Sequence, residues 1–257
     1  MNGQRIISLF ESLYPKNLAY DWDNVGLQIG TLNKTITTIL LTLDVTKEVI
    51  EEAIKNNCDL IIAHHPLIFS PIKGIQTETY QGHIIKELIK NDITLYIAHT
   101  NFDISNYGMD SMLASMIGLE NQENLDDITD NEGLGKIGNV KEQSMKDIIK
   151  HVKNVFKVED ARFIGDLNAI VKTVAISGGS GSSNIINAVH KKADLFITGD
   201  ITYHKALDCV NYGINTLDIG HYIEHHFMYH LKNVLESEGV TAKVITSKVV
   251  TNPYTFV

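Results

Sequence analysis

The amino-acid sequence predicts an α/β protein of two related α/β lobes, each built from a mixed sheet with helices on its faces. Short apolar runs at 39–43, 60–63 and 93–98 alternate with stretches of helical periodicity, the pattern of strands joined through helices. A second strand–helix–strand pattern follows later in the chain. With 257 residues, 44% of them hydrophobic and 21% charged, the chain can bury one large or two small cores.

The first strand–helix–strand unit spans residues 39–65. Its helix is predicted from apolar residues that recur along one helical face, namely Val45, Val49, Ile50, Ala53 and Ile54. The apolar run at 60–63 is the strand that follows. Another helix around 84–89 then leads into the strand at 93–98.

Residues 174–200 repeat the layout of residues 39–65 with a constant offset of 135, under which His65 falls on Asp200. We interpret this as two related units, each of which ends a strand at a residue with useful chemistry. Chance similarity is the alternative, because strand–helix–strand patterns resemble one another. Between the repeats, the polar, glycine-bearing stretch 123–140 is the predicted junction of the lobes.

The composition restricts the classes of function. A formal net charge of −9 without a cluster of Lys and Arg argues against nucleic acid or anionic membranes as partners. No apolar run approaches the ~18 residues of a membrane span, and the start lacks the features of a signal peptide. Cys58 and Cys209 lie far apart and suit a reducing compartment. We therefore expect a cytoplasmic protein.

Residues that can bind metal follow four of the predicted strands. In chain order they are His64 and His65, His99 and Asp103, Asp200 and His204, and His221. Ligands of open α/β sheets bind beyond the carboxyl ends of the strands, so these endings predict one shared site.

The adjacent pair His64 and His65 needs a special explanation, because neighbouring side chains of a regular strand point to opposite faces. Pro66 favours extended geometry at His65 and cannot continue a sheet ladder. Irregular backbone there can turn both imidazoles toward one site, or toward two metals close together. The alternative is one histidine in the core and one in solvent.

The segment GHYIEHHF adds His221 and Glu224, which share a face if a helix begins there. His225 is a competing candidate, but a carboxylate can bridge two cations and an imidazole cannot. We interpret His226 and His230 as surface or subunit-contact residues.

The predicted metal ligands are three imidazoles and two carboxylates: His64, His65, Asp103, His221 and Glu224. This set suits Zn, Fe, Mn, Co or Ni, and two divalent ions would need water to complete their coordination. Residues expected to orient ligands or transfer protons are His99, Asp200 and His204. For the last two, local capping and turn bonds are the alternative. The glycine-rich stretch 177–184 suits either a tight turn, which we favour, or a phosphate site at a helix start.

Several motifs together resemble the NIF-three-like family, whose bacterial members are known as GTP cyclohydrolase type 2 homologues. The matching stretches, in the order of the family, are WDNVGLQIG, AHHPLIF, AHTNFD, GLGKIG, SGGSG, TGDITYHKALD and DIGHYIEHHF. They run from about residue 15 to residue 230. The combination of HHP, HTNFD and GHYIE is specific, whereas each motif alone would be weak.

The resemblance implies the NIF-three-like fold, with a first lobe over 1–127, completed by about 215–257, and a second lobe over 128–214. It implies a dinuclear centre, with two divalent metal ions per chain on the five ligands named above. Some relatives carry the last carboxylate four residues after the histidine, where this chain has His225. It also implies assembly into a ring-shaped homohexamer.

We expect a metal-dependent hydrolase of a small-molecule substrate, in which a metal-activated water attacks a purine-like or other amidine or amide carbon. The resemblance implies an activity like that of GTP cyclohydrolase. The alternative is a metal-binding regulatory or metal-handling protein without turnover. A ring that grips nucleic acid is a third possibility, which the acidic charge disfavours.

Overall fold

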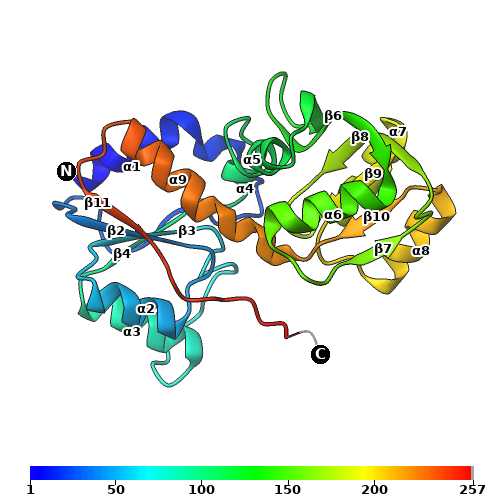
Figure 1. Ribbon diagram of the computed structural model, residues 1–257. Coiled ribbons are helices and arrows are strands. Elements are labelled where there is room, and N and C mark those ends of the chain that lie inside the picture. Colours follow the sequence, from blue (N-terminus) through cyan, green and yellow to red (C-terminus); the bar gives the residue numbers. More distant parts are fainter. Residues whose placement is uncertain (256–257) are drawn as a thin grey trace. The chain divides into compact units, whose positions relative to one another are not determined.

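The computed structural model describes residues 1–255 and separates the chain into two compact units (Figure 1). The first unit comprises Met1–Phe102 and His225–Tyr254, and the second comprises Asp103–Glu224. Each unit contains one mixed sheet with its own helices, which confirms the α/β class predicted from the sequence. No helix within residues 1–255 combines the length and apolar character that a membrane crossing requires.

The first unit holds a five-stranded sheet. Its strands are β1 (Gly26–Ile29), β2 (Thr38–Thr42), β3 (Leu60–Ala63), β4 (Thr94–Ile97) and β11 (Lys243–Thr246). Its helices are α1 (Gly3–Leu13), η1 (Lys16–Leu18), α2 (Lys47–Lys55), α3 (Tyr80–Lys90) and α9 (Phe227–Ser237). The strand order is β1-β4-β3-β2-β11, in which only the β1–β4 pair is antiparallel. The C-terminal strand therefore extends the sheet that the N-terminal strands begin.

Strands β2, β3 and β4 are buried along their whole length, as expected for parallel strands covered on both faces. On one face, Leu40 and Ile61 pack with Ala53 of α2 and Leu88 of α3. Helices α1 and α9 lie on the opposite side of this sheet (Figure 1). The apolar runs of the sequence are thus explained by a sheet with two covered faces.

Helix starts follow from short polar side chains that accept a hydrogen bond from the first turn. Thr46 caps α2 and Thr79 caps α3 in this way. Such caps stabilise a helix by about 1 kcal/mol each. The sequence therefore sets where these helices begin, and burial of one apolar face sets how they lie on the sheet.

The second unit holds a six-stranded sheet. Its strands are β5 (Glu120–Asp127), β6 (Gly133–Ser144), β7 (Arg162–Ile164), β8 (Ile170–Ile176), β9 (Leu195–Thr198) and β10 (Thr216–Asp218). Its helices are α5 (Met109–Met116), α6 (Met145–Phe156), η2 (Gly181–Asn184), α7 (Ile185–His190) and α8 (Tyr203–Tyr212). The order is β5-β6-β8-β9-β10-β7, with β8, β9 and β10 parallel to one another.

The two compact units divide inside α4 (Thr100–Ile104) and inside η3 (His221–His226). The lobe bounds 1–127 and 128–214 stay a prediction. The stretch 123–140, predicted as a junction, forms most of the β5–β6 hairpin, which the second sheet incorporates through the pairing of β6 with β8. The stretch is polar because β5 is an edge strand with an exposed face, so its composition is similar to that of a linker.

The predicted internal repeat also appears in the hydrogen bonds, because equivalent residues of the two units form equivalent strand pairs and side-chain bonds. In the first unit Ile39, Leu40 and Leu41 pair with Leu60, Ile61 and Ile62, and in the second Val174, Ala175 and Ile176 pair with Leu195, Phe196 and Ile197. Every pair is related by the offset found in the sequence. The carboxylate of Asp59 accepts a hydrogen bond from the backbone N–H of Thr38 at 3.0 Å, and that of Asp194 accepts one from Thr173 at 2.8 Å.

Candidate metal centre

Three histidines of the first unit come together where β3 and β4 end. His64 and His65 follow β3 directly, and His99 follows β4 after Ala98. Because these strands pair in parallel, their carboxyl ends lie at the same edge of the sheet. One ligand atom from each of the three side chains lies within 4.8 Å of the others, a spacing at which they could hold a metal ion.

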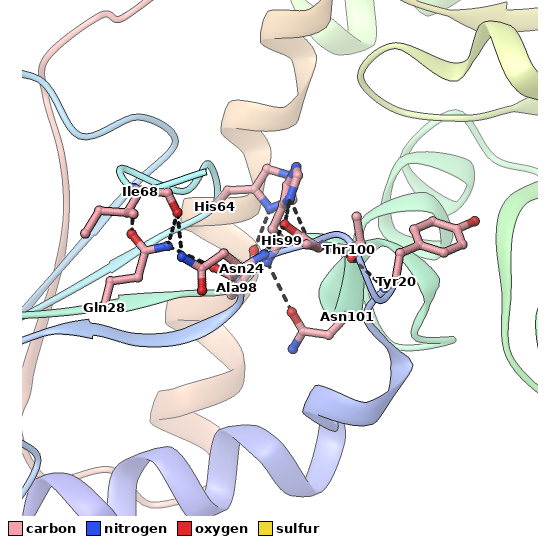
Figure 2. A network of polar contacts seen from close by, with 10 residues as sticks. Tyr20, Asn24, Gln28, His64, Ile68, Ala98, His99, Thr100 and Asn101 are labelled. Atoms are coloured by element: carbon pink, nitrogen blue, oxygen red, sulfur yellow. Dashed lines mark hydrogen bonds and ion pairs between the residues drawn. The ribbon is translucent and has the colours of Figure 1, made fainter. Parts of the chain in front are cut away.

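The Nδ1 atoms of His64 and His99 are held by acceptors, as Figure 2 shows for His64. His64 Nδ1 lies 2.7 Å from the carbonyl oxygen of Ala98, and His99 Nδ1 lies 2.9 Å from both carboxylate oxygens of Asp23. These oxygens can only accept, so Nδ1 carries the proton in both rings. In this neutral tautomer Nε2 keeps a free lone pair, and a histidine in this form can bind a metal through Nε2.

His65 follows the same rule with a different acceptor. Its Nδ1 donates to Oδ1 of Asp44 at 2.7 Å, just beyond the end of β2. The backbone N–H groups of His64 and His65 still continue the ladder, by donating to Thr42 and Leu43. The two rings nevertheless lie with centroids 5.0 Å apart and an interplanar angle of 49°. The adjacent histidines therefore do contribute to one cluster.

Asp23 is the strongest of these anchors. Its side chain is fully buried and also accepts from the backbone N–H of Thr100 at 3.1 Å and from its hydroxyl at 2.6 Å. Burial alone would raise the pKa of the Asp23 carboxyl, but the hydrogen bonds from His99 and Thr100 outweigh it and lower the pKa to about 2. Asp23 is thus a fixed negative charge that orients His99 at neutral pH.

In the second unit, η3 carries a candidate nitrogen ligand and a candidate carboxylate ligand. His221 Nδ1 lies 2.8 Å from Oδ2 of Asp200, which follows β9, so this imidazole also has its Nδ1 anchored by a carboxylate. Its Nε2 lies 3.0 Å from Oε2 of Glu224. Glu224 is only 4% exposed. His221 and Glu224, three residues apart, therefore point their donor atoms at each other, as the sequence spacing predicts.

The glycine-rich loop after β8 is shaped to receive these side chains. A Cβ at Gly179, where φ is +54°, would lie 2.5 Å from Oε1 of Glu224 and 3.3 Å from Nε2 of His221. Gly181 donates its backbone N–H to the hydroxyl of Thr198 at 2.9 Å. The loop therefore lies directly against the two candidate ligands.

A buried carboxyl that we did not predict supports the same loop. Asp110, 1% exposed, accepts hydrogen bonds from the backbone N–H groups of Gly135 and of Gly178, the latter at 2.7 Å. Burial raises the pKa of Asp110 to about 6, although both hydrogen bonds act in the opposite direction. The side chain links the turn that opens β6 to the loop beside Glu224.

The remaining predicted residues have distinct surroundings. Asp103 lies in α4, which begins directly after His99. Asp200 makes the contact expected of a residue that orients a ligand. His204 is exposed near the start of α8, where its ring meets Tyr203 edge-on with centroids 5.6 Å apart. A proton-transfer role for His204 stays a prediction. In contrast, His99, to which we assigned an indirect role, belongs to a possible ligand group.

The other histidines of the GHYIEHHF segment lie in the first unit. The rings of His225 and His226 have centroids 4.2 Å apart. His230 Nε2 lies 3.5 Å from the hydroxyl of Tyr14. The subunit-contact role of His226 and His230, and the role of His225 as a competing ligand, stay predictions.

Sequence reasoning missed the anchors Asp23, Asp44 and Asp110. Asp44 ends an apolar run just as His64 does, so the strand-end argument could have found it. Asp23 lies in the WDNVGLQIG motif, but nothing in its local pattern indicates a bond to His99. Asp110 resembles an ordinary first-turn acidic residue of a helix.

The residues fit a transition metal better than a purely oxygen-liking ion. The candidate donors are neutral imidazole nitrogens together with carboxylate oxygens. Anchoring of Nδ1 by a carboxylate or a carbonyl is the usual support for a metal-bound histidine, since it fixes the tautomer and the ring. The structure thus has His and Glu side chains that could hold a metal.

Comparison with known proteins agrees with this description. The sequence pattern of the family described as Duf34/NIF3 (NGG1p interacting factor 3) matches residues 1–253. A protein of Streptococcus pneumoniae named "GTP cyclohydrolase 1 type 2 homolog" is 37% identical, over 99% of this chain and 99% of its own length. A protein of the same name from Lactococcus lactis is 36% identical over 95% of each.

Solved structures show the same fold. A Bacillus cereus protein described as related to NIF3 superposes with a TM-score of 0.94 and 32% identity, over 100% of this chain and 99% of that chain. The structure described as reduced HcgD from Methanocaldococcus jannaschii gives a TM-score of 0.82 at 31% identity, over 97% of this chain and 98% of that chain. From the matching family, relatives and fold, we conclude that the chain belongs to the Duf34/NIF3 family.

Proposed function

We propose that this protein is a metal-dependent hydrolase of a small molecule that uses a pair of divalent metal ions. The observation that carries the proposal is the shared state of four imidazoles: His64, His65, His99 and His221 each have Nδ1 bonded to an oxygen acceptor. A hydrogen bond of this kind at Nδ1 typically supports a metal-bound histidine, because it fixes the tautomer and the ring orientation. Local packing alone does not require four imidazoles to be oriented in this same way.

Divalent ions bound by these residues would lower the pKa of water into the neutral range and so supply a nucleophile. The protein supplies the rest. Asp23 and Asp200 hold the imidazoles that they contact in one orientation. In the proposal, His64, His65, Asp103, His221 and Glu224 are ligands, and His204 transfers protons. His99 either joins the ligands or assists proton transfer.

We further propose a purine-like or other amidine or amide carbon as the point of attack. The name carried by the relatives makes GTP the first substrate to test. A cytoplasmic setting is part of the proposal, supported by two buried free thiols, Cys58 and Cys209. Assembly into a homohexameric ring is proposed from the family resemblance.

The test measures metal content and GTP turnover on the same purified samples. We expect His64→Ala and Glu224→Ala to lower the metal content per chain and to reduce GTP turnover by more than about 100-fold. His190→Ala removes an exposed histidine at the end of α7 and is the matched control, with both quantities unchanged.

The outcomes separate the possible functions. Full metal loading of the wild type without turnover of GTP or of small amides would contradict the hydrolase and favour a metal-handling protein. Equal metal content in His64→Ala, Glu224→Ala and the wild type would contradict the assigned ligands.

A further inference from the structure

The single tryptophan of the chain lies exposed next to the histidine cluster of the first unit. Trp22 is 58% exposed, and the neighbouring Phe69 is 53% exposed. Aromatic rings of this size bury large apolar areas in most proteins, so two exposed rings in contact are unusual. Their position suggests a use at the surface.

The rings around Trp22 form a continuous aromatic group. Tyr20 stacks on Trp22 with centroids 5.5 Å apart and planes within 17° of parallel. Phe69 lies at 5.8 Å, tilted by 47°. On the side of the metal ligands, the His99 ring meets Trp22 edge-on at 6.4 Å. The aromatic group therefore adjoins the candidate site directly.

The backbone on both sides of this group is fixed by hydrogen bonds (Figure 2). Tyr20 donates its N–H to the hydroxyl of Thr100 at 3.2 Å. Ile68, the residue before Phe69, donates its N–H to Gln28 at 2.9 Å, and its carbonyl accepts from both Gln28 and Asn24. A platform held in place in this way would lose little conformational entropy when a ligand binds.

We propose that Trp22 and Phe69 form a stacking platform for a planar heteroaromatic ring, such as a nucleobase, in the substrate. Flat π surfaces stack with any nucleobase without requiring a particular hydrogen-bond pattern. A ring held there lies beside His99, so an amidine or amide carbon of that ring adjoins the candidate metal ligands. The inference rests on the proposed function, because it names the substrate class of the same site.

Trp22 provides its own reporter, since no other tryptophan contributes to the fluorescence. Zn-loaded protein is excited at a wavelength that selects tryptophan and titrated with guanosine, with adenosine and, as a non-aromatic control, with ribose. We expect the tryptophan fluorescence to decrease saturably with both nucleosides and to stay unchanged with ribose. A strictly linear, unsaturable decrease in fluorescence with both nucleosides would contradict the proposed platform.

Variants separate stacking from folding and from subunit contact. By equilibrium dialysis with labelled guanosine, we expect Trp22→Ala to bind at least about 10-fold more weakly and Trp22→Phe to stay within about 3-fold of the wild type. The guanosine affinity of Phe69→Ala should lie between those of Trp22→Ala and Trp22→Phe. Tyr254→Ala, which removes an exposed ring from the C-terminal segment, is the control that leaves affinity unchanged.

Two results overturn the platform. One is equal guanosine affinity of Trp22→Ala and wild type in the dialysis experiment. The other is a change in subunit number for Trp22→Ala, measured by light scattering, with affinity unaltered, because the rings would then serve a protein contact.

Failure of the platform is distinguishable from failure of the proposed function. Hydrolysis of non-aromatic amides without nucleoside binding removes the platform and keeps the hydrolase. Saturable nucleoside binding that depends on Trp22, without hydrolysis of any substrate, supports the platform and removes the hydrolase.

Discussion

At the scale of single residues, glycines decide whether the candidate ligands of the second unit can take their positions. Gly179 lies against both His221 and Glu224, and its φ of +54° belongs to the left-handed region. Gly213 ends α8 with a φ of +70°, but a Cβ there would meet nothing within 4 Å. The two positions have the same backbone requirement and differ in what surrounds them.

This difference gives a controlled prediction. We expect Gly179→Ala to displace the Glu224 carboxylate and to weaken metal binding by about 10-fold or more, as disturbed support of a ligand does. Gly213→Ala should reduce stability by about 1 kcal/mol and leave metal affinity unchanged. The measurements are a metal titration and a urea unfolding curve for each variant. Equal metal affinity of Gly179→Ala and Gly213→Ala would show that the loop does not position Glu224.

Asp110 predicts a pH dependence of stability. Because its pKa is raised to about 6 in the folded protein, the folded state binds this proton more tightly than the unfolded state between about pH 4 and pH 6. Its contribution to the free energy of unfolding therefore falls as pH rises through this window. The shift from 3.8 to about 6 corresponds to a change on the order of 3 kcal/mol.

The measurement compares wild type with Asp110→Asn in metal-free urea unfolding at about pH 4 and pH 7. We expect the stability advantage of the wild type over the variant to shrink by that amount at the higher pH. The comparison cancels groups that titrate equally in both proteins. Parallel pH profiles would contradict a raised pKa at Asp110.

At the scale of elements, α8 has an apolar surface that its own unit does not cover. Tyr203, Leu207 and Val210 lie on one face at helical spacing and are 75%, 44% and 62% exposed. Cys209 is the residue of this helix that is buried. A row of exposed apolar side chains on one helix is typical of a contact with another chain. This face of α8 is therefore a candidate surface for the proposed self-association.

We therefore expect Leu207→Lys and Val210→Lys to weaken assembly, because a charge buried in an apolar contact without a partner is strongly unfavourable. Sedimentation at matched concentrations should show smaller species, with a dissociation constant raised by at least about 10-fold. Ile89→Lys changes a residue of α3 that is 63% exposed and serves as the control. Wild-type mass in both α8 variants would exclude this helix from the interface.

At the scale of the whole molecule, the two units share one construction. The offset seen in the sequence reappears in the pairing of β2 with β3 and of β8 with β9. It reappears also in the left-handed residues that follow the helices between these strands, Asn57 and Lys192, with φ of 51° and 56°. Chance similarity would not preserve strand register, the left-handed residue after the helix and the backbone-to-carboxylate hydrogen bonds of Asp59 and Asp194 together.

The sequence by itself determined the α/β class, the repeat, the strand ends that hold His64, His65 and His99, and the pairing of His221 with Glu224. These follow from short-range rules, because apolar periodicity and residue spacing depend on the regular geometry of strands and helices. Recognition of the family also rested on short motifs.

Only the tertiary structure decided which distant groups support these residues. The bonds from His99 to Asp23 and from Gly178 to Asp110 join residues far apart in the chain, where no periodicity relates them. It also decided that the stretch 123–140 is mostly a hairpin and not a junction, since an exposed edge strand has the composition of a linker. Local patterns fix the elements, whereas long-range hydrogen bonds and burial fix the site.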